Sequence, residues 1–337
     1  MASKIKEPVI TLSAGPVAAY PRVLRAMSRP VQYDFDPWFQ QFYEDVTRKC
    51  AAALRVKDPA LILQVEPAPG IEAAAASLIS PNDTVLNLAS GVYGKGFGYW
   101  SARYHKDMVE IEVPYNEAID PGQVADAFRK RPDIKIVSLV HHDTPSGTLN
   151  PAREIGKIVR EHDGLLIVDA VSSFGGMDIH PDDCFADIFI TGPGKCLGAA
   201  PGLTIMSVSD RAWKHIEANP KAPFASVLSL KDWKNAWSKE KPFPFTPSVA
   251  EINGLDGLRN DLGTTRRDTF VRQFCRKLPG YALGRSVQLS DEPLLDEMQQ
   301  RLEQSDYRSS AAVETIVASD QFRKIRGKDD PRVTAAE

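Results

Sequence analysis

The chain reads LLIVDAVSSFGG over residues 165–176 and DIFITGPGK over residues 187–195, and these two segments decide the fold. Each contains a short apolar run that is followed by small residues, glycine or proline. Apolar runs of this length with such boundaries predict buried strands. Asp169 closes the first strand and Lys195 follows the second. A carboxylate and an amine are therefore expected at the edge of an α/β sheet where ligands bind.

Asp169 and Lys195 form a pair that suits chemistry on carbonyl compounds. A lysine amine can condense with a carbonyl carbon to give an imine. In pyridoxal sites the lysine forms this Schiff base, and an acid pairs with the protonated pyridine nitrogen. The two residues alone also allow a plainer interpretation, in which a surface lysine and a strand-end aspartate are unrelated.

The composition is that of a globular protein and points away from nucleic acid or membranes. The 337 residues are 43% hydrophobic and 25% charged, and the net charge is -3. No apolar run approaches the ~20 residues of a membrane span, and the N-terminus lacks the apolar core of a signal peptide. The four cysteines are scattered without metal-ligand spacing. We therefore expect no metal and a reducing, cytoplasmic setting.

The remaining segments alternate between strand and helix patterns. Short apolar runs predict strands at 61–63, 84–88, 111–114 and 134–140. Helices are expected at 21–27, 36–54, 71–79, 121–130 and 153–162. Strands that alternate with helices of about ten residues imply a mostly parallel, doubly wound α/β sheet.

Two segments near strand ends allow more than one interpretation. Residues 89–100, ASGVYGKGFGYW, alternate glycines with aromatics. This pattern suits either stacking on a flat ring or a glycine-rich helix start with core aromatics. His141 and His142 follow the strand predicted at 134–140. Because neighbours on an extended chain face opposite ways, a structural role is favoured over joint binding of one metal ion.

Several of these segments together resemble the fold type I, class V pyridoxal-dependent aminotransferases over residues ~8–256. The segments are SAGP at 13–16, VDAVSSFGG at 168–176, TGPGK at 191–195 and APGL at 200–203. Two longer segments, NLASGVYGKGFGYW at 87–100 and PFPFTPSV at 242–249, are very similar to a branch of that class that acts on free pyridoxamine. The resemblance implies the large domain of that fold.

The resemblance also implies a role for each residue of the site. Lys195 would form the Schiff base and then shuttle a proton between the substrate carbon and the exocyclic carbon of the ring. Asp169 would pair with the protonated ring nitrogen, which makes the ring an electron sink. Tyr93 would stack on the ring face. Either Thr144 or Ser146 would hydrogen-bond the side of the phenolic oxygen.

The end of the site that would hold a 5′-phosphate departs from the family pattern. Family members use a loop rich in glycine and serine, a polar residue before the lysine, and a tyrosine and a threonine lent by the partner subunit. Here Glu66 and Pro67 stand in the loop, and Gly194 precedes the lysine. The lent pair becomes Phe243 and Thr246, so only Thr246 keeps its hydroxyl. A dianion beside Glu66 would be poorly solvated, so free pyridoxal and pyridoxamine fit better than pyridoxal 5′-phosphate.

These expectations combine into one reaction, in which pyridoxamine and pyruvate give pyridoxal and L-alanine. Gly15 and Pro16 would lie near the substrate carboxylate, and Glu66 would line the 5′ end of the ring. The enzyme would be a homodimer or a higher homo-oligomer with shared active sites. Two alternatives stay open: a phosphate-dependent class V enzyme of the alanine/serine–glyoxylate type, and a truncated, impaired pyridoxal-binding protein.

The resemblance to aminotransferases ends near Gly257, which divides the chain into domains 1–256 and 257–337. In place of the usual small domain, the tail predicts three helices, at 269–283, 293–304 and 311–324. It resembles a domain of unknown function that usually ends large bacterial proteins with c-type haem modules, but no Cys-x-x-Cys-His occurs here and no haem is implied. The family's small domain carries the arginine that clamps the keto-acid carboxylate. That role stays unassigned, because the family motif is matched by none of Arg259, Arg266, Arg267, Arg272 and Arg285.

Overall fold

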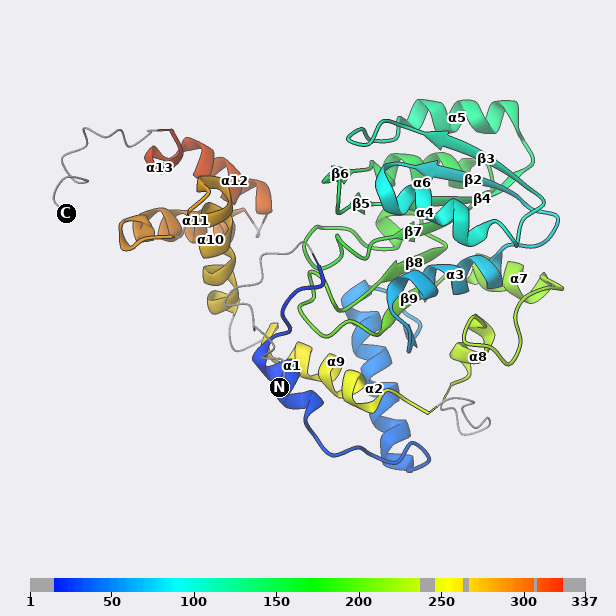
Figure 1. The fold of residues 1–337 in the computed structure, drawn as a ribbon, viewed down its shortest axis with the longest axis horizontal. Helices are drawn as coiled ribbons and strands as arrows, with labels where there is room; N and C mark the ends of the chain where they lie inside the picture. The colour runs from blue at the N-terminus through cyan, green and yellow to red at the C-terminus, as the bar shows by residue number, and fades with distance from the viewer. Residues whose placement is uncertain (1–14, 237–245, 263–266, 286, 306–307, 324–337) are drawn as a thin grey trace, which may run out of the picture. The chain divides into compact units, whose positions relative to one another are not determined.

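The computed structural model describes residues 15–236, 246–262, 267–285, 287–305 and 308–323 of the chain (Figure 1). The chain divides into two compact units, Met1–Leu258 and Arg259–Glu337. Within the described residues, no helix has the length and apolar character needed to cross a membrane. Each unit is taken by itself below.

A seven-stranded sheet forms the centre of the first unit, in the order β1-β9-β8-β7-β4-β2-β3. Neighbouring strands from β3 to β8 run parallel, whereas β9 is antiparallel to both β8 and β1. The mostly parallel α/β sheet predicted from the sequence is therefore confirmed. The strands are β1 (Leu61–Leu63), β2 (Thr84–Ala89), β3 (Asp107–Glu112), β4 (Ile134–Val140), β7 (Leu165–Asp169), β8 (Ile188–Thr191) and β9 (Thr204–Val208).

Helices cover this sheet, and a short hairpin extends from its edge (Figure 1). The hairpin pairs β5 (His142–Asp143) with β6 (Thr148–Leu149) directly after β4. The helices are α1 (Pro21–Met27), α2 (Pro37–Leu54), α3 (Pro67–Leu78), α4 (Gly91–Ser101), α5 (Pro121–Lys130), α6 (Ala152–Glu161), the short 3-10 helix η1 (Asp182–Cys184), α7 (Asp210–Ala218), α8 (Leu230–Lys234) and α9 (Val249–Leu262).

Two elements of the first unit differ by several residues from the ranges that the sequence predicts. Helix α3 begins at Pro67, four residues before the expected start, because Glu66 serves as its N-cap and a proline is tolerated in a first turn. Strand β3 begins at Asp107 and ends at Glu112, because its six residues pair in register with the six residues of β2. Residues 91–101 of the glycine- and aromatic-rich segment form the helix α4.

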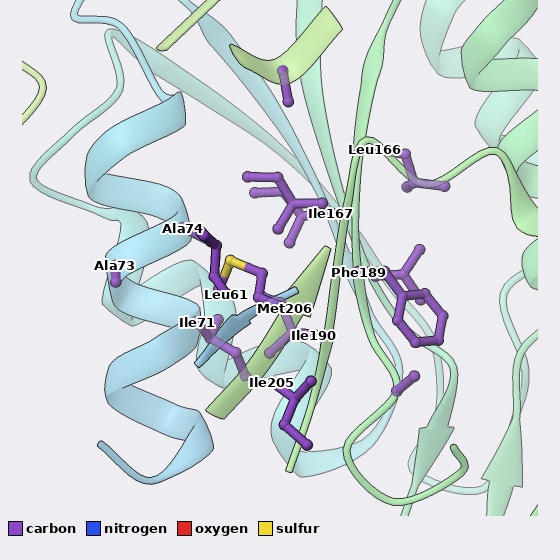
Figure 2. Packing of buried hydrophobic residues seen from close by; sticks show 14 of the residues in the cluster. Leu61, Ile71, Ala73, Ala74, Leu166, Ile167, Phe189, Ile190, Ile205 and Met206 are labelled. Carbon is purple, nitrogen blue, oxygen red and sulfur yellow. The ribbon is translucent and has the colours of Figure 1, made fainter. Parts of the chain in front are cut away.

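The core lies on both faces of the sheet, because parallel strands are covered by helices on each side. Figure 2 shows Ile167, Ile190 and Met206 pointing toward the alanine-rich helix α3, while Leu166 and Phe189 point to the opposite face. All five are buried. Alternate residues of β7 and β8 thus supply the two halves of the core, and the ends of these strands are held rigidly.

The second unit is a small helical bundle with its own apolar core. Its elements are α10 (Arg267–Leu283), the 3-10 helix η2 (Leu289–Asp291), α11 (Glu292–Gln304), α12 (Ser309–Ala318) and α13 (Asp320–Arg323). The single helix expected at 311–324 is wrong. The chain breaks at Ser319, whose extended backbone ends α12, and its hydroxyl accepts a hydrogen bond from the Phe322 N–H.

Candidate active site

A cavity of about 280 Å³ opens at the carboxyl ends of β4 and β7 and in the loop after β8. This is the edge at which parallel α/β sheets bind ligands. Seven of the residues singled out in the sequence line the cavity together, namely Gly15, Pro16, Glu66, Tyr93, Thr144, Asp169 and Lys195. Gly15 and Lys195, which are 180 positions apart in the chain, therefore meet at one site.

The Lys195 side chain is held by a hydrogen bond and by close packing. Its Nζ donates to Thr144 Oγ1 at 3.0 Å and lies 5.2 Å from the centroid of the Tyr93 ring. The backbone of Gly15 passes directly against the lysine stem. A Cβ at that position would lie 3.0 Å from Lys195 Cε, and its φ of +142° is also one that side chains rarely adopt. The lysine is thus fixed with its amine in the cavity.

Asp169 ends β7 at the base of the cavity. Its Oδ1 accepts a hydrogen bond of 2.8 Å from the Val171 N–H. Burial raises the pKa of the Asp169 carboxyl to about 6, although the Val171 hydrogen bond and the Lys195 charge lower it. A partly buried carboxylate of this kind is stabilised by an adjacent cation, because an opposite charge favours the ionised form. Asp169 is therefore suited to hold a protonated ring nitrogen.

Tyr93 owes its position to a carboxylate from another strand. Helix α4 has no side-chain cap of its own, and Asp143 of β5 takes that role by accepting a 3.0 Å hydrogen bond from the Tyr93 N–H. Gly91 makes room for this contact, because a Cβ there would lie 2.2 Å from Asp143 Cγ. The glycine in the sequence motif thus serves the approach of a buried acid to the helix start.

The N-terminus of α3 forms the wall beside Glu66. The Glu66 carboxylate accepts a 3.2 Å hydrogen bond from the Ala68 N–H. The neighbouring positions, Pro67 and Pro69, have no N–H to offer. Opposite them, Gly192 packs so closely that a Cβ would lie 2.4 Å from Pro67 Cγ. This wall therefore offers a negative charge and few hydrogen-bond donors.

Two predicted contacts lie outside the cavity lining. Ser146 donates its hydroxyl to Asp143 Oδ2 at 2.7 Å, so it supports the capping carboxylate while Thr144 reaches the cavity. Thr246 is exposed and does not line the cavity of its own chain. Phe243 lies outside the described residues. The roles of Ser146 and Thr246 in ligand binding stay predictions.

Among the described lining residues there is no arginine. Two of the five arginines that the sequence leaves unassigned form ion pairs within the second unit. Arg272 contacts Glu292 and Asp296, and Arg285 contacts Asp291. The side chains of the other three lie outside those that the structure describes, namely Arg259, Arg266 and Arg267.

Sequence reasoning missed several lining residues, of which His142 and Ser172 are the most polar. His141 is buried and its Nδ1 lies 2.8 Å from Ser173 Oγ, which fits the structural role expected for it. His142 faces the cavity instead. The sequence contained a signal for this orientation. Successive side chains of a strand face opposite ways, so when His141 points into the core, His142 must point away from it.

A mostly parallel sheet that brings a lysine, a partly buried acid and an aromatic ring together at its carboxyl edge defines a fold type I pyridoxal-dependent enzyme. The chain belongs to the class-V aminotransferase family, whose model matches residues 26–258. Residues 250–322 match a second family, described as a protein of unknown function (DUF1585). The pyridoxal class and the family predicted from the sequence are thereby confirmed.

The chain is also similar in sequence and structure to individual aminotransferases. Pyridoxamine–pyruvate transaminase of Mesorhizobium japonicum is 65% identical over 250 residues, which are 74% of this chain and 64% of the relative. (S)-Ureidoglycine–glyoxylate transaminase of Bacillus subtilis is 34% identical over 62% of this chain and 50% of its own length. The crystal structure of pyridoxamine–pyruvate aminotransferase from Mesorhizobium loti superposes with a TM-score of 0.77 at 59% identity, covering 84% of this chain and 74% of that one. The chain thus spans less than two thirds of the length of these two curated relatives.

Proposed function

We propose that the chain binds free pyridoxamine and pyridoxal in this cavity and transfers the amino group between pyridoxamine and pyruvate, giving pyridoxal and L-alanine. The 65% identity to a transaminase named for that reaction supports the proposal. Such an activity belongs to the breakdown of vitamin B6. The residues of the cavity fit the ring, because they supply a lysine, a tyrosine that can stack on the ring and a partly buried acid.

The observation that carries the choice of free pyridoxal over its phosphate is the first turn of α3. Helix N-termini bind phosphate through unpaired N–H groups. Here the N–H of Ala68 is already bonded to Glu66, and Pro67 and Pro69 have none. A phosphate dianion beside the Glu66 carboxylate would cost several kcal/mol if left without donors. An uncharged 5′-hydroxymethyl group can instead donate a hydrogen bond to that carboxylate.

The side chains of the cavity divide the work on the bound ring. When bound, pyridoxal supplies a carbonyl carbon that reacts with amines and a ring that accepts electrons once its nitrogen is protonated. Asp169 keeps that proton on the nitrogen by charge. Lys195 holds and moves a proton at its Nζ, and Thr144 fixes the direction of that amine through the 3.0 Å hydrogen bond. Tyr93 stacks on the ring face.

We further propose that the active form is a cytoplasmic homodimer or higher homo-oligomer whose subunits share their sites. Six large hydrophobic residues between positions 20 and 38 are exposed, and this concentration of exposed apolar side chains in one segment supports an interaction surface. They are Tyr20, Leu24, Val31, Tyr33, Phe35 and Trp38. Thr246 is exposed on its own chain, as expected of a residue lent to a partner. All four cysteines are free, which fits a reducing compartment.

The test uses the purified full chain with added pyridoxal. We expect an absorbing adduct that borohydride traps on Lys195, that Lys195→Ala abolishes and that Lys221→Ala, a change at an exposed lysine, leaves intact. Alanine formed from pyridoxamine and pyruvate completes the proposed activity. An adduct only with pyridoxal 5′-phosphate would support the phosphate-dependent alternative. An adduct without alanine would support the impaired binding protein, and no adduct at all would exclude both enzymes.

A further inference from the structure

Two consecutive histidines pair with two consecutive serines across the edge of the cavity. His141 Nδ1 lies 2.8 Å from Ser173 Oγ, and His142 Nδ1 lies 2.9 Å from Ser172 Oγ. The backbone N–H of His141 also donates to the backbone carbonyl of Asp169 at 2.8 Å. The start of the β5 hairpin is thus fixed to the loop that follows Asp169. His142 and Ser172 both line the cavity, whereas His141 is buried behind it.

The contacts of Ser172 determine the hydrogen on the His142 ring. Ser172 has one hydroxyl hydrogen, and its Oγ also contacts the His142 carbonyl oxygen, which can only accept. The hydroxyl therefore donates to the carbonyl and accepts from the imidazole, so that Nδ1 carries the ring hydrogen. Burial lowers the pKa of His142, and the Lys195 charge adds to this against the opposing charge of Asp143, which favours the neutral ring. In that tautomer Nε2 is an acceptor, and the structure gives it no partner among the residues it describes.

The shape of the ligand indicates what this acceptor meets. In pyridoxal the ring nitrogen and the carbon that bears the aldehyde lie at opposite ends of the ring. The 3-hydroxyl occupies one flank, and the 5-hydroxymethyl group occupies the other. With the nitrogen at Asp169, the aldehyde at Lys195 and the hydroxymethyl group at Glu66, the 3-hydroxyl faces the remaining wall. Thr144, which contacts Lys195 Nζ, and His142, two residues before it, both line the cavity and are the polar groups left to meet the 3-hydroxyl.

We propose that His142 is a specificity-determining residue, whose Nε2 accepts a hydrogen bond from the 3-hydroxyl of the ring. Thr144 complements it, because its hydroxyl accepts from Lys195 Nζ and can donate its own hydrogen to the same ring oxygen. The 3-hydroxyl would then donate one hydrogen bond, to His142, and accept one, from Thr144. This inference rests on the proposed binding of free pyridoxal-type rings.

The test compares two unreactive ligands that differ only at this position. The ligands are 4-deoxypyridoxine, which keeps the 3-hydroxyl, and its analogue with hydrogen in place of that hydroxyl. Their Kd values are measured by calorimetry on the full chain. Wild type should bind the hydroxyl ligand more tightly, by up to about tenfold for each of the two hydrogen bonds that the 3-hydroxyl makes. His142→Leu should reduce this ratio by up to about tenfold, because only the hydrogen bond from Thr144 remains, and His142→Gln, which keeps an acceptor near the position of Nε2, should restore part of it.

The outcomes separate the inference from the proposed function. Equal binding of both ligands by wild type, or an unchanged ratio in His142→Leu, would overturn the role of His142 while leaving ring binding intact. Binding of neither ligand by wild type would overturn the proposed function as well. If the leucine variant does not fold, ¹⁵N spectra of the six histidines in wild type decide, with His142→Gln giving the assignment. The Nε2 resonance of His142 should then move with the hydroxyl ligand alone, and an equal response to both ligands would contradict the proposal.

Discussion

Replacing Asp169 by asparagine should stabilise the ligand-free protein at neutral pH. Burial raises the pKa of the Asp169 carboxyl from 3.8 to about 6. The folded protein therefore binds this proton more tightly than the unfolded chain. The resulting stability is fully present below pH 3.8 and is lost as the pH rises through about 6. Asparagine is always neutral, and its oxygen can still accept the Val171 hydrogen bond.

The magnitude follows from the pKa difference. Each pKa unit corresponds to about 1.4 kcal/mol, so a rise from 3.8 to about 6 is equivalent to about 3 kcal/mol. We expect Asp169→Asn to raise the free energy of unfolding by about 3 kcal/mol at pH 7.5. The gain should shrink to about 0.5 kcal/mol at pH 4, where the wild-type carboxyl is protonated in the folded state and nearly half protonated in the unfolded chain.

The assay is urea unfolding followed by tryptophan fluorescence at both pH values. All five tryptophans lie at or before position 237, so their signal reports on the first unit alone. Asp58→Asn, at an exposed position, is the matched control and should change stability by less than about 0.5 kcal/mol. A variant no more stable than wild type at pH 7.5, or a gain that does not vary with pH, would refute the reasoning. The same variant should lose affinity for 4-deoxypyridoxine, since the ring nitrogen loses its anion.

Two further predictions address the packing of the lysine and the independence of the second unit. Gly15→Ala should slow formation of the pyridoxal adduct at least tenfold, because the new Cβ would lie 3.0 Å from Lys195 Cε. Stopped-flow absorbance measures the rate. The control is Gly280→Ala, whose Cβ has no neighbour nearer than 3.5 Å and which should leave the rate unchanged. Arg285→Ala should destabilise the second unit by roughly 3 kcal/mol, because it leaves the fully buried Asp291 without its cation. Circular dichroism should then show an early loss of helix with no change in tryptophan fluorescence, and a simultaneous change of both signals would contradict separate units.

The sequence predicts the parallel part of the sheet because its strands are buried on both faces and read as continuous apolar runs. It does not predict the start of α3, because Pro67 and Pro69 are typical of a loop and only the Glu66 contact with Ala68 shows that a helix has begun. The break at Ser319 is missed for a related reason. A single polar residue ends α12 through local hydrogen bonds, while the apolar spacing continues past it.

The candidate site divides in the same way. Lys195 and Asp169 can be placed from the sequence because Asp169 ends one strand and Lys195 follows the next, and parallel strands end at one edge. The residues that position the neighbouring site side chains cannot be placed from the sequence, because they act through contacts between segments far apart in the chain. Asp143 caps α4 from 50 residues away, and Ser172 fixes the tautomer of His142 from 30 residues away. Spacing within a motif carries no information on such pairs.

Ring binding and recognition of the second substrate depend on different parts of the molecule. The contacts proposed for the ring are fixed within the first unit, through the ends of β7 and β8 and the first turns of α3 and α4. The described lining residues include no arginine, which is the natural bidentate partner of a keto-acid carboxylate. A transaminase must bind both the ring and the keto-acid carboxylate. Because different residues bind them, the chain can lose carboxylate binding and keep ring binding. Adduct formation and alanine formation therefore measure separate properties of this chain. A protein that forms the Lys195 adduct but no alanine would bind the ring and would fail at a later step, of which the binding of pyruvate is the first.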